Sequence, residues 1–111
     1  MELWIALVQL VEEVQMFKKV DSNQTRVVKA LRDLGATVQH LHAVGKGCPD
    51  LLVGYKGSNY LLEVKDGEKP ESARKLTPDQ VIWHYDWRGQ VAIVTSPKEA
   101  IDKILSMANN Q

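Results

Sequence analysis

Asp50, Glu63 and Lys65 have the side-chain types and the spacing needed for metal-assisted hydrolysis of a phosphodiester. Glu63 and Lys65 are two residues apart, so on a strand both side chains point to the same face. A tight hairpin would bring Asp50, which begins the preceding predicted strand, opposite Glu63. Hard divalent cations such as Mg²⁺ prefer oxygen ligands, and a lysine beside them can orient the attacking water. A salt-bridged surface pair, with Asp50 in a turn, fits the same spacing equally well.

Local sequence signals predict that these residues lie in a domain that mixes helices and strands. Good N-caps at 21–23 begin a helix that Gly35 ends, and turn residues at 56–59 join two strands into a hairpin. In chain order the predicted elements are helices at 2–19 and from 21–23 to Gly35, strands at 37–44, 50–55 and 60–65, an exposed charged loop at 66–76, a helix at 78–87, a strand at 90–95, and a last helix after Ser96 and Pro97. The strand at 90–95 is nearly all apolar, which is typical of a buried strand.

The first 20 residues are predicted to form a separate amphipathic helix. Its apolar stripe consists of Leu3, Leu7, Leu10, Val14 and Phe17. Such a stripe suits packing on the rest of the chain or contact with a second copy. Acidic residues interrupt it and no basic region precedes it, so neither a signal peptide nor a membrane span is expected.

The composition is that of one globular domain, because 111 residues with 44% hydrophobic content can build a single modest core. Cys48 is the single cysteine, which excludes an intramolecular disulfide and suits a cytoplasmic setting. The 14 basic and 14 acidic residues balance to a formal charge of +0. This balance argues against nonspecific wrapping of DNA, although a local basic face can still form.

The Gly47–Asp50 segment (Gly-Cys-Pro-Asp) is followed thirteen residues later by Glu63–Lys65 (Glu-Val-Lys), and together they resemble the signature of the PD-(D/E)xK nucleases. More narrowly, small VRR-NUC domains and Holliday-junction-resolvase-like members carry similar motifs and a downstream glutamine, which Gln80 matches. The resemblance implies an α/β fold with a restriction-endonuclease-like core (αβββαβ), in which helices flank a mixed central sheet. The chain would then divide into an extra N-terminal helix at 1–20 and a nuclease domain at 21–111.

The resemblance also implies a role for each matching residue. Asp50 and Glu63 would be ligands of Mg²⁺ or Mn²⁺, and the Val64 backbone carbonyl would be a third ligand. Lys65 would position the attacking water, and Gln80 would support the site from its helix.

One position departs from the family pattern. Many members have a glutamate in the first core helix that reaches the metal, whereas here Asn23 or Gln24 occupies the neighbourhood as a possible supporting residue. An amide is a neutral and weaker ligand, so a site with one metal ion is expected.

Several other residues are candidates for binding roles. DNA contacts are predicted for Lys46, Lys69, Arg74 and Lys75. His40 and His42 would share a strand face, but without a third nitrogen or sulfur ligand nearby a surface role is favoured over a zinc site.

For three further residues, a structural role is favoured over a functional one. Trp83 and Trp87 are four apart on a predicted helix, a spacing most often found in a core, with stacking on an unpaired base as the alternative. Cys48 lacks a partner for nucleophilic catalysis and is predicted to be a small buried residue.

The predicted function is that of a divalent-metal-dependent endonuclease that hydrolyses DNA without an organic cofactor. The resemblance implies structured or branched DNA as the substrate and a phage or bacterial origin. A homodimer would place two sites on one junction. Two alternatives stay open: a catalytically inert DNA-binding or assembly module that retains the fold, and a structural protein that works through its N-terminal helix. The missing helix carboxylate and the zero charge favour the inert module, whereas the complete Asp50, Glu63 and Lys65 set argues against it.

Overall fold

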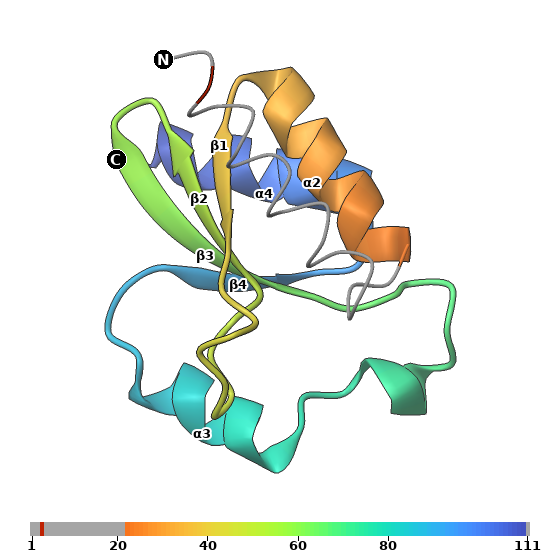
Figure 1. The fold of residues 1–111 in the computed structure, drawn as a ribbon. Coiled ribbons are helices and arrows are strands. Elements are labelled where there is room, and N and C mark those ends of the chain that lie inside the picture. Colours follow the sequence, from red (N-terminus) through yellow and green to blue (C-terminus); the bar gives the residue numbers. More distant parts are fainter. Residues whose placement is uncertain (1–2, 4–21, 111) are drawn as a thin grey trace.

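The computed structural model describes residue 3 and residues 22–110 of the chain. In chain order the elements are α2 (Ser22–Leu34), β1 (Thr37–His40), β2 (Leu51–Tyr55), β3 (Ser58–Val64), the 3₁₀ helix η1 (Glu71–Arg74), α3 (Pro78–Asp86), β4 (Val91–Val94) and α4 (Pro97–Asn109). This order confirms the predicted one from the second helix onward (Figure 1). The predicted helix at 2–19 and its dimer contact lie outside the described residues, apart from Leu3.

The four strands form one mixed sheet in the order β1-β2-β3-β4. Strands β1, β2 and β3 pair with one another antiparallel, and β4 runs parallel to β3 after the crossover through α3. The prediction that the last strand is buried is wrong for most of its length, because β4 lies at the edge of the sheet. Val94 is fully buried there, whereas Ile93 is 40% exposed.

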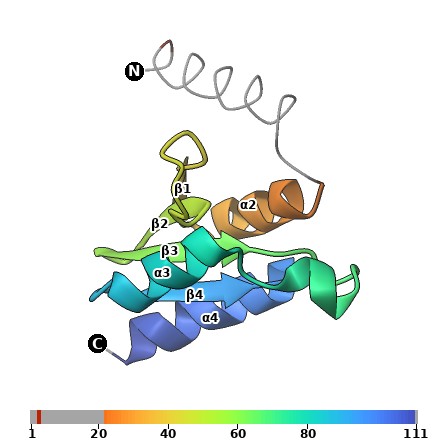
Figure 2. The same ribbon diagram turned by 90° about the horizontal axis from the view of Figure 1, so that it is seen from below.

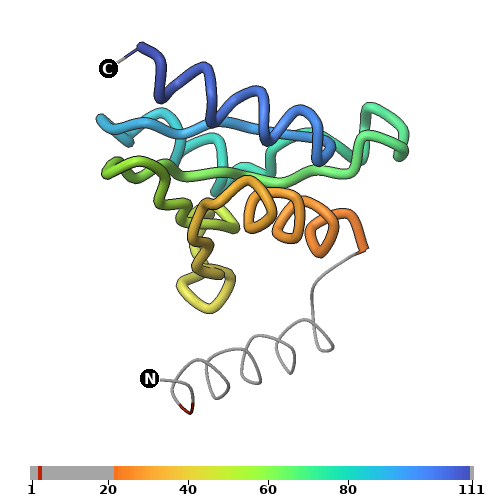
Figure 3. The backbone as a smooth tube through the Cα atoms, turned by 90° about the horizontal axis from the view of Figure 1, so that it is seen from above, coloured from red at the N-terminus to blue at the C-terminus, as the bar shows by residue number. Residues whose placement is uncertain are grey.

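One face of the sheet carries the core. Strand residues on this face include Val38, Leu51, Val53, Leu62, Val64 and Val94, and they pack with Val27, Val28 and Leu31 of α2 and with Ala100 and Ile104 of α4. Helices α2 and α4 also pack against each other (Figure 3). Helix α3 lies on the other side of the sheet, where Figure 2 shows it nearest the viewer. Because side chains alternate along a strand, residues next to the core positions face α3.

Two stretches of left-handed backbone shape the sheet near its ends. The predicted strand at 37–44 stops at His40, because residues 42–44 form a turn that the Val44 N–H closes on the Leu41 carbonyl at 2.9 Å. Gly45, Lys46 and Gly47 follow with positive φ, at 74°, 54° and 82°. Such residues cannot continue an extended strand, so the chain turns toward α3 instead. Lys56 and Gly57 also have positive φ and join β2 to β3 as a two-residue turn, which confirms the predicted hairpin.

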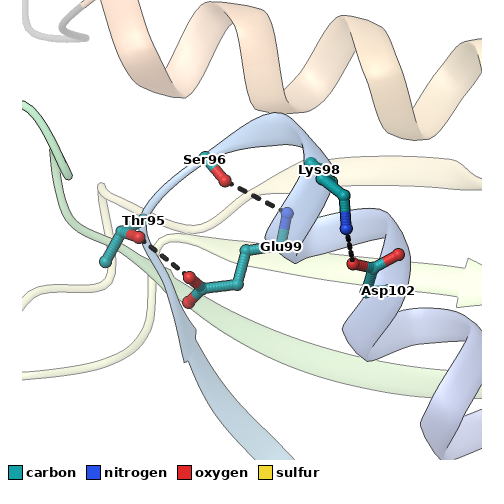
Figure 4. Close-up of polar contacts among 5 residues, drawn as sticks. All are labelled: Thr95, Ser96, Lys98, Glu99 and Asp102. Carbon is teal, nitrogen blue, oxygen red and sulfur yellow. Dashed lines mark hydrogen bonds and ion pairs between the residues drawn. The ribbon is translucent and has the colours of Figure 1, made fainter.

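Helix α4 begins where the sequence predicts, at a serine cap followed by proline. The Ser96 side chain accepts a hydrogen bond from the Glu99 N–H at 3.1 Å, and the Thr95 hydroxyl donates to the Glu99 carboxylate at 2.9 Å (Figure 4). A Lys98–Asp102 ion pair follows on the exposed surface of the first turns. Among the helices of the described ranges, none is long and apolar enough to cross a membrane.

Candidate active site

Asp50 and Glu63 face each other across the open end of the β2–β3 hairpin. The register pairs Leu51 with Leu62, which places Asp50 opposite Glu63. The Val64 N–H donates to Asp50 Oδ2 at 2.7 Å and holds that carboxylate against the end of β3. Glu63 is only 2% exposed, and its Oε1 is buried without a hydrogen-bond partner. The structure therefore brings the two acidic residues together, as the hairpin argument predicts.

Ionising both Asp50 and Glu63 at once is unfavourable, because Glu63 is buried next to the other carboxyl group. Burial, then a hydrogen bond to Asp50 and the Asp50 charge, together raise the pKa of Glu63 to about 9, against a lowering by the Lys65 charge. Glu63 on its own would thus hold a proton at neutral pH. A divalent cation fits these residues, since it would supply the positive charge that lets the buried Glu63 ionise beside Asp50.

Lys65 is held in place from helix α3. Its Nζ donates to Gln80 Oε1 at 2.9 Å, and the Thr77 N–H donates to the same oxygen at 2.9 Å. The Thr77 hydroxyl in turn accepts from the Gln80 N–H at 3.3 Å, which completes a capping box at the start of α3. The interactions that begin this helix therefore also orient the side chain that meets the lysine.

A polar groove of about 300 Å³ joins these side chains. It is lined by Gln24, Asp50, Glu63, Val64, Lys65, Asp66, Lys69, Ala73 and Gln80. Across the described ranges 3 and 22–110, no group of three or more His, Cys, Asp or Glu side chains is placed to hold a metal ion. A cation in the groove would therefore depend on two carboxylates, a backbone carbonyl such as that of Val64, and water.

The two amides at the start of α2 occupy different positions. Gln24 lines the groove, as expected for a supporting residue. The Asn23 side-chain amide instead donates to the backbone carbonyls of Lys65 at 2.8 Å and Thr95 at 3.2 Å. Asn23 thus ties the first turn of α2 to the ends of β3 and β4, next to the site.

The four predicted DNA-contact residues are spread over two regions. Lys69 lines the groove, and the segment that bears Arg74 and Lys75 continues from its edge through Ala73. Lys46 lies elsewhere, in a second hollow on α3. The structure therefore places Lys69 beside the carboxylates, Arg74 and Lys75 on the segment that follows the groove, and Lys46 apart.

Three sequence expectations about aromatic and histidine residues need correction. Trp83 and Trp87 are not core residues, because α3 has no buried residue and Trp87 is 44% exposed. The surface role favoured for His40 is also wrong, since its side chain is 7% exposed and packs edge-on against His42. The two errors have different causes. Helix α3 has no buried residue, so its tryptophans stay outside the core, whereas His40 shares the buried side of β1 with Val38.

Two further residues lie near the carboxylates and the lysine. Burial and then the Lys65 charge hold the pKa of His84 below its usual value, so its ring is neutral at pH 7. Its spacing of four from Gln80 on the same helix is the sequence signal that could have placed it there. Burial, followed by the Glu63 and Asp50 charges, raises the pKa of Cys48, which is half-buried and keeps its thiol protonated.

Gly47 lets the motif loop touch helix α3. A Cβ atom at this glycine would lie 2.3 Å from the Asp79 carbonyl oxygen and 2.8 Å from the Gln80 nitrogen. Real Cβ atoms do not approach backbone so closely, so only glycine allows the contact. Gly47 therefore sets the distance between the loop that ends in Asp50 and the helix that carries Gln80.

Gly47→Ala is expected to lower the free energy of unfolding more than Gly57→Ala. Both glycines have φ near +82°, at +82° and +81°, but a Cβ at Gly57 meets nothing within 4 Å. Gly57→Ala should cost about 1–2 kcal/mol for left-handed backbone alone, and the steric conflict at Gly47 should add about 1–3 kcal/mol. Urea unfolding of both variants measures the difference, and equal losses would mean that the contact with α3 is unimportant.

Comparison with known proteins identifies the fold and the family of the chain. A solved structure described as a VRR_NUC domain matches with a TM-score of 0.57 and 30% sequence identity, over 75% of this chain and 89% of that one. No family model matches the chain, and no curated protein matches it. The shared fold includes the mixed four-stranded sheet between helices, which confirms the expected restriction-endonuclease-like architecture. The chain therefore belongs to the VRR-NUC family within the PD-(D/E)xK nuclease superfamily.

Proposed function

We propose that this protein is a divalent-metal-dependent endonuclease that hydrolyses phosphodiester bonds of DNA at the Asp50–Glu63 groove. The observation that carries the proposal is the pairing of Asp50 with the buried Glu63, which has an unpartnered carboxyl oxygen; both line a polar groove together with Lys65. Ionising Glu63 beside Asp50 is unfavourable without a counter-charge, and a divalent cation between the two carboxyl groups would supply it.

The chain's own residues would divide the work as follows. Asp50, Glu63 and the Val64 carbonyl would hold Mg²⁺ or Mn²⁺. When bound, the cation supplies polarisation of a phosphoryl oxygen and a water of lowered pKa. Glu63 would have to be ionised to serve as a ligand, because a ligating carboxyl group carries no proton.

Lys65 and Lys69 would act on the substrate in the same groove. Lys65, whose Nζ donates to Gln80 Oε1 at 2.9 Å, would orient the attacking water. It would also offset the negative charge of the pentacovalent transition state. Lys69 lines the groove and can neutralise a neighbouring phosphate of the strand. This proposal assigns no role to the neutral Cys48 thiol.

The experiment is a cleavage panel with purified full-length protein on duplex, flap and four-way DNA. Cleavage is expected with Mg²⁺ or Mn²⁺ and should stop when EDTA removes the ion. Calorimetric titration of either ion should show binding at the same site. If the protein neither binds the ions nor cuts any of the three substrates, the enzyme proposal fails and an inert DNA-binding module takes its place.

Gln80→Ala is expected to slow cleavage by about 10- to 100-fold, because it deletes the side chain that orients Lys65. Thr77→Ala is the matched control: it removes the hydroxyl cap of α3 and leaves the Gln80–Lys65 hydrogen bond in place. Both variants should lose a similar free energy of unfolding, about 1 kcal/mol. Single-turnover rates separate the two, and equal rates would show that Gln80 acts only through helix stability.

Within this proposal we also infer a preference for branched DNA and a homodimeric state. Both follow from the resemblance to junction-resolving nucleases, since two copies related by a two-fold axis would place two sites on one junction. A phage or bacterial cytoplasmic origin belongs to the same inference. Light scattering should give twice the 12.5 kDa mass of the chain. A four-way junction should then show paired, symmetric nicks, whereas a monomer that cuts only linear duplex contradicts the inference.

A further inference from the structure

Helix α3 bears a second hollow that the proposed reaction does not use. It has a volume of about 220 Å³ and is lined by Lys46, Asp79, Ile82, Trp83, Asp86 and Trp87. Asp79, Ile82, Trp83 and Asp86 are three or four residues apart along α3, so they share one side of the helix, and Trp87 follows at its C-cap. Lys46 reaches the hollow from the motif loop, which Gly47 holds against the helix.

The indole rings of Trp83 and Trp87 stack on each other and form an aromatic wall of the hollow. Their rings are stacked, with centroids 4.7 Å apart and an angle of 19° between the planes. Gly89 supports the outer ring: a Cβ there would lie 2.8 Å from Trp87 Nε1, so the indole packs on the glycine backbone. An aromatic wall that is held in place and still partly exposed is suited to stacking with another flat ring.

The charges around the hollow favour a base over a phosphate. Asp79 and Asp86 both line it, and their carboxylates would repel a phosphate group but can accept N–H hydrogen bonds from the edge of a base. Lys46 supplies one positive charge from the loop, where it can meet the phosphate of the same nucleotide. The hollow is also smaller than the pockets of about 300–1,000 Å³ that take drug-sized ligands, which fits a single base.

Helix α3 and the motif loop contribute residues to both the hollow and the catalytic groove, so the two sites are adjacent. Helix α3 places Gln80 in the groove and Trp83, three residues later, in the hollow. The motif loop runs from Lys46 at the hollow to Asp50 at the groove. A DNA strand whose phosphodiester lies at Asp50 can therefore extend toward the tryptophans.

We propose that this hollow receives one unpaired base of the DNA strand that lies in the Asp50–Glu63 groove. The proposal rests on the proposed nuclease function and deepens it, because bases within a duplex have both faces covered by their neighbours. Only a flap, a fork arm or a distorted junction offers a free face to Trp83 and Trp87. The hollow would thus select DNA with an unpaired nucleotide next to the cleaved bond.

The test measures binding without cleavage, using the Asp50→Asn chain in the presence of Mg²⁺. The probe is a forked DNA with a fluorescent label on its duplex end, made once with normal bases in its single-stranded arm and once with abasic sites there. Trp87→Ala, added to that chain, should weaken binding of the normal fork about 5- to 100-fold, the usual size of a base-stacking contact. It should not change binding of the abasic fork, and Trp87→Phe should restore most of the loss.

Tyr85→Ala is the matched control, because Tyr85 lies on the same helix, is 84% exposed and does not line the hollow. Equal losses for Tyr85→Ala and Trp87→Ala, equal losses on both forks, or no binding of either fork would overturn the proposal. Unfolding curves confirm that the variants stay folded.

The two proposals can fail separately. If the parent cuts DNA but Trp87→Ala has no base-dependent effect, only the base site is wrong. If Asp50→Asn binds the fork through Trp87 but the parent cuts nothing, the nuclease function is wrong and the base site stands.

Discussion

Asp50→Asn is expected to slow metal-dependent cleavage of DNA by at least about 100-fold, while the protein stays as stable as the parent or becomes more stable without metal. The asparagine oxygen can still accept the 2.7 Å hydrogen bond from the Val64 N–H, so the local backbone should not move. The neutral amide is a poor ligand for Mg²⁺. It also removes the charge that opposes ionisation of Glu63. Single-turnover cleavage and urea unfolding in EDTA measure the two effects.

Asp66→Asn is the control for this prediction. Asp66 lines the same groove, and its carboxylate accepts a hydrogen bond from the Glu68 N–H, so the substitution makes the same chemical change beside the carboxylate pair. It should reduce cleavage by less than about 10-fold. Similar rates for the two variants would show that groove charge, and not the Asp50–Glu63 pair, supports the reaction. A fully active Asp50→Asn protein would remove the proposed site.

Stability without metal is expected to fall as pH rises, because the folded chain holds a proton on Glu63 that the unfolded chain releases. The pKa of Glu63 is raised from 4.5 to about 9 by folding. Between these values the folded state binds more protons than the unfolded state, so this contribution is complete below the lower pKa and is lost as pH rises toward the higher one. The slope should be at most about 1.4 kcal/mol per pH unit. Urea unfolding in EDTA at about pH 5, 7 and 8.5 measures it.

If the proposed function is correct, Mg²⁺ should reverse this trend, because it would bind the ionised carboxyl groups and not the protonated Glu63. Stabilisation by the ion should therefore grow with pH, and it should reach about 2.7 kcal/mol when the ion is about 100 times its dissociation constant. Glu63→Gln keeps the size of the side chain but cannot ionise, so both the pH slope and the Mg²⁺ effect should flatten. A parent protein whose stability in EDTA rises between about pH 5 and 8.5 contradicts the raised pKa.

Much of the site follows from short-range signals in the sequence. The two-residue turn at Lys56 and Gly57 sets the hairpin register, and that register alone places Asp50 opposite Glu63. The Thr77 cap and Pro78 begin α3 and place Gln80 at the third residue of that helix. These relations depend on residues close in sequence or on strand alternation, so they are predictable without knowledge of how the elements pack.

Other features depend on how distant segments pack together. The apolar run of β4 does not reveal that the strand lies at the sheet edge, and the spacing of Trp83 and Trp87 does not reveal that α3 stands away from the core. An apolar pattern marks a face that can be buried, but the partner that covers it comes from another part of the chain. The hydrogen bonds of Asn23 are equally unpredictable from the sequence, because its amide donates to the carbonyls of Lys65 and Thr95, which lie 42 and 72 residues away.

The sequence by itself therefore determined the order of the described elements, the placement of Asp50 opposite Glu63, and the family to which the chain belongs. The tertiary structure decided how deeply Glu63 is buried, and with it the pKa of about 9. It also decided that the motif loop meets α3 at Gly47 and forms a hollow beside the tryptophans. The physical reason is that burial and cavities are properties of several segments at once, whereas caps, turns and strand alternation act between near neighbours.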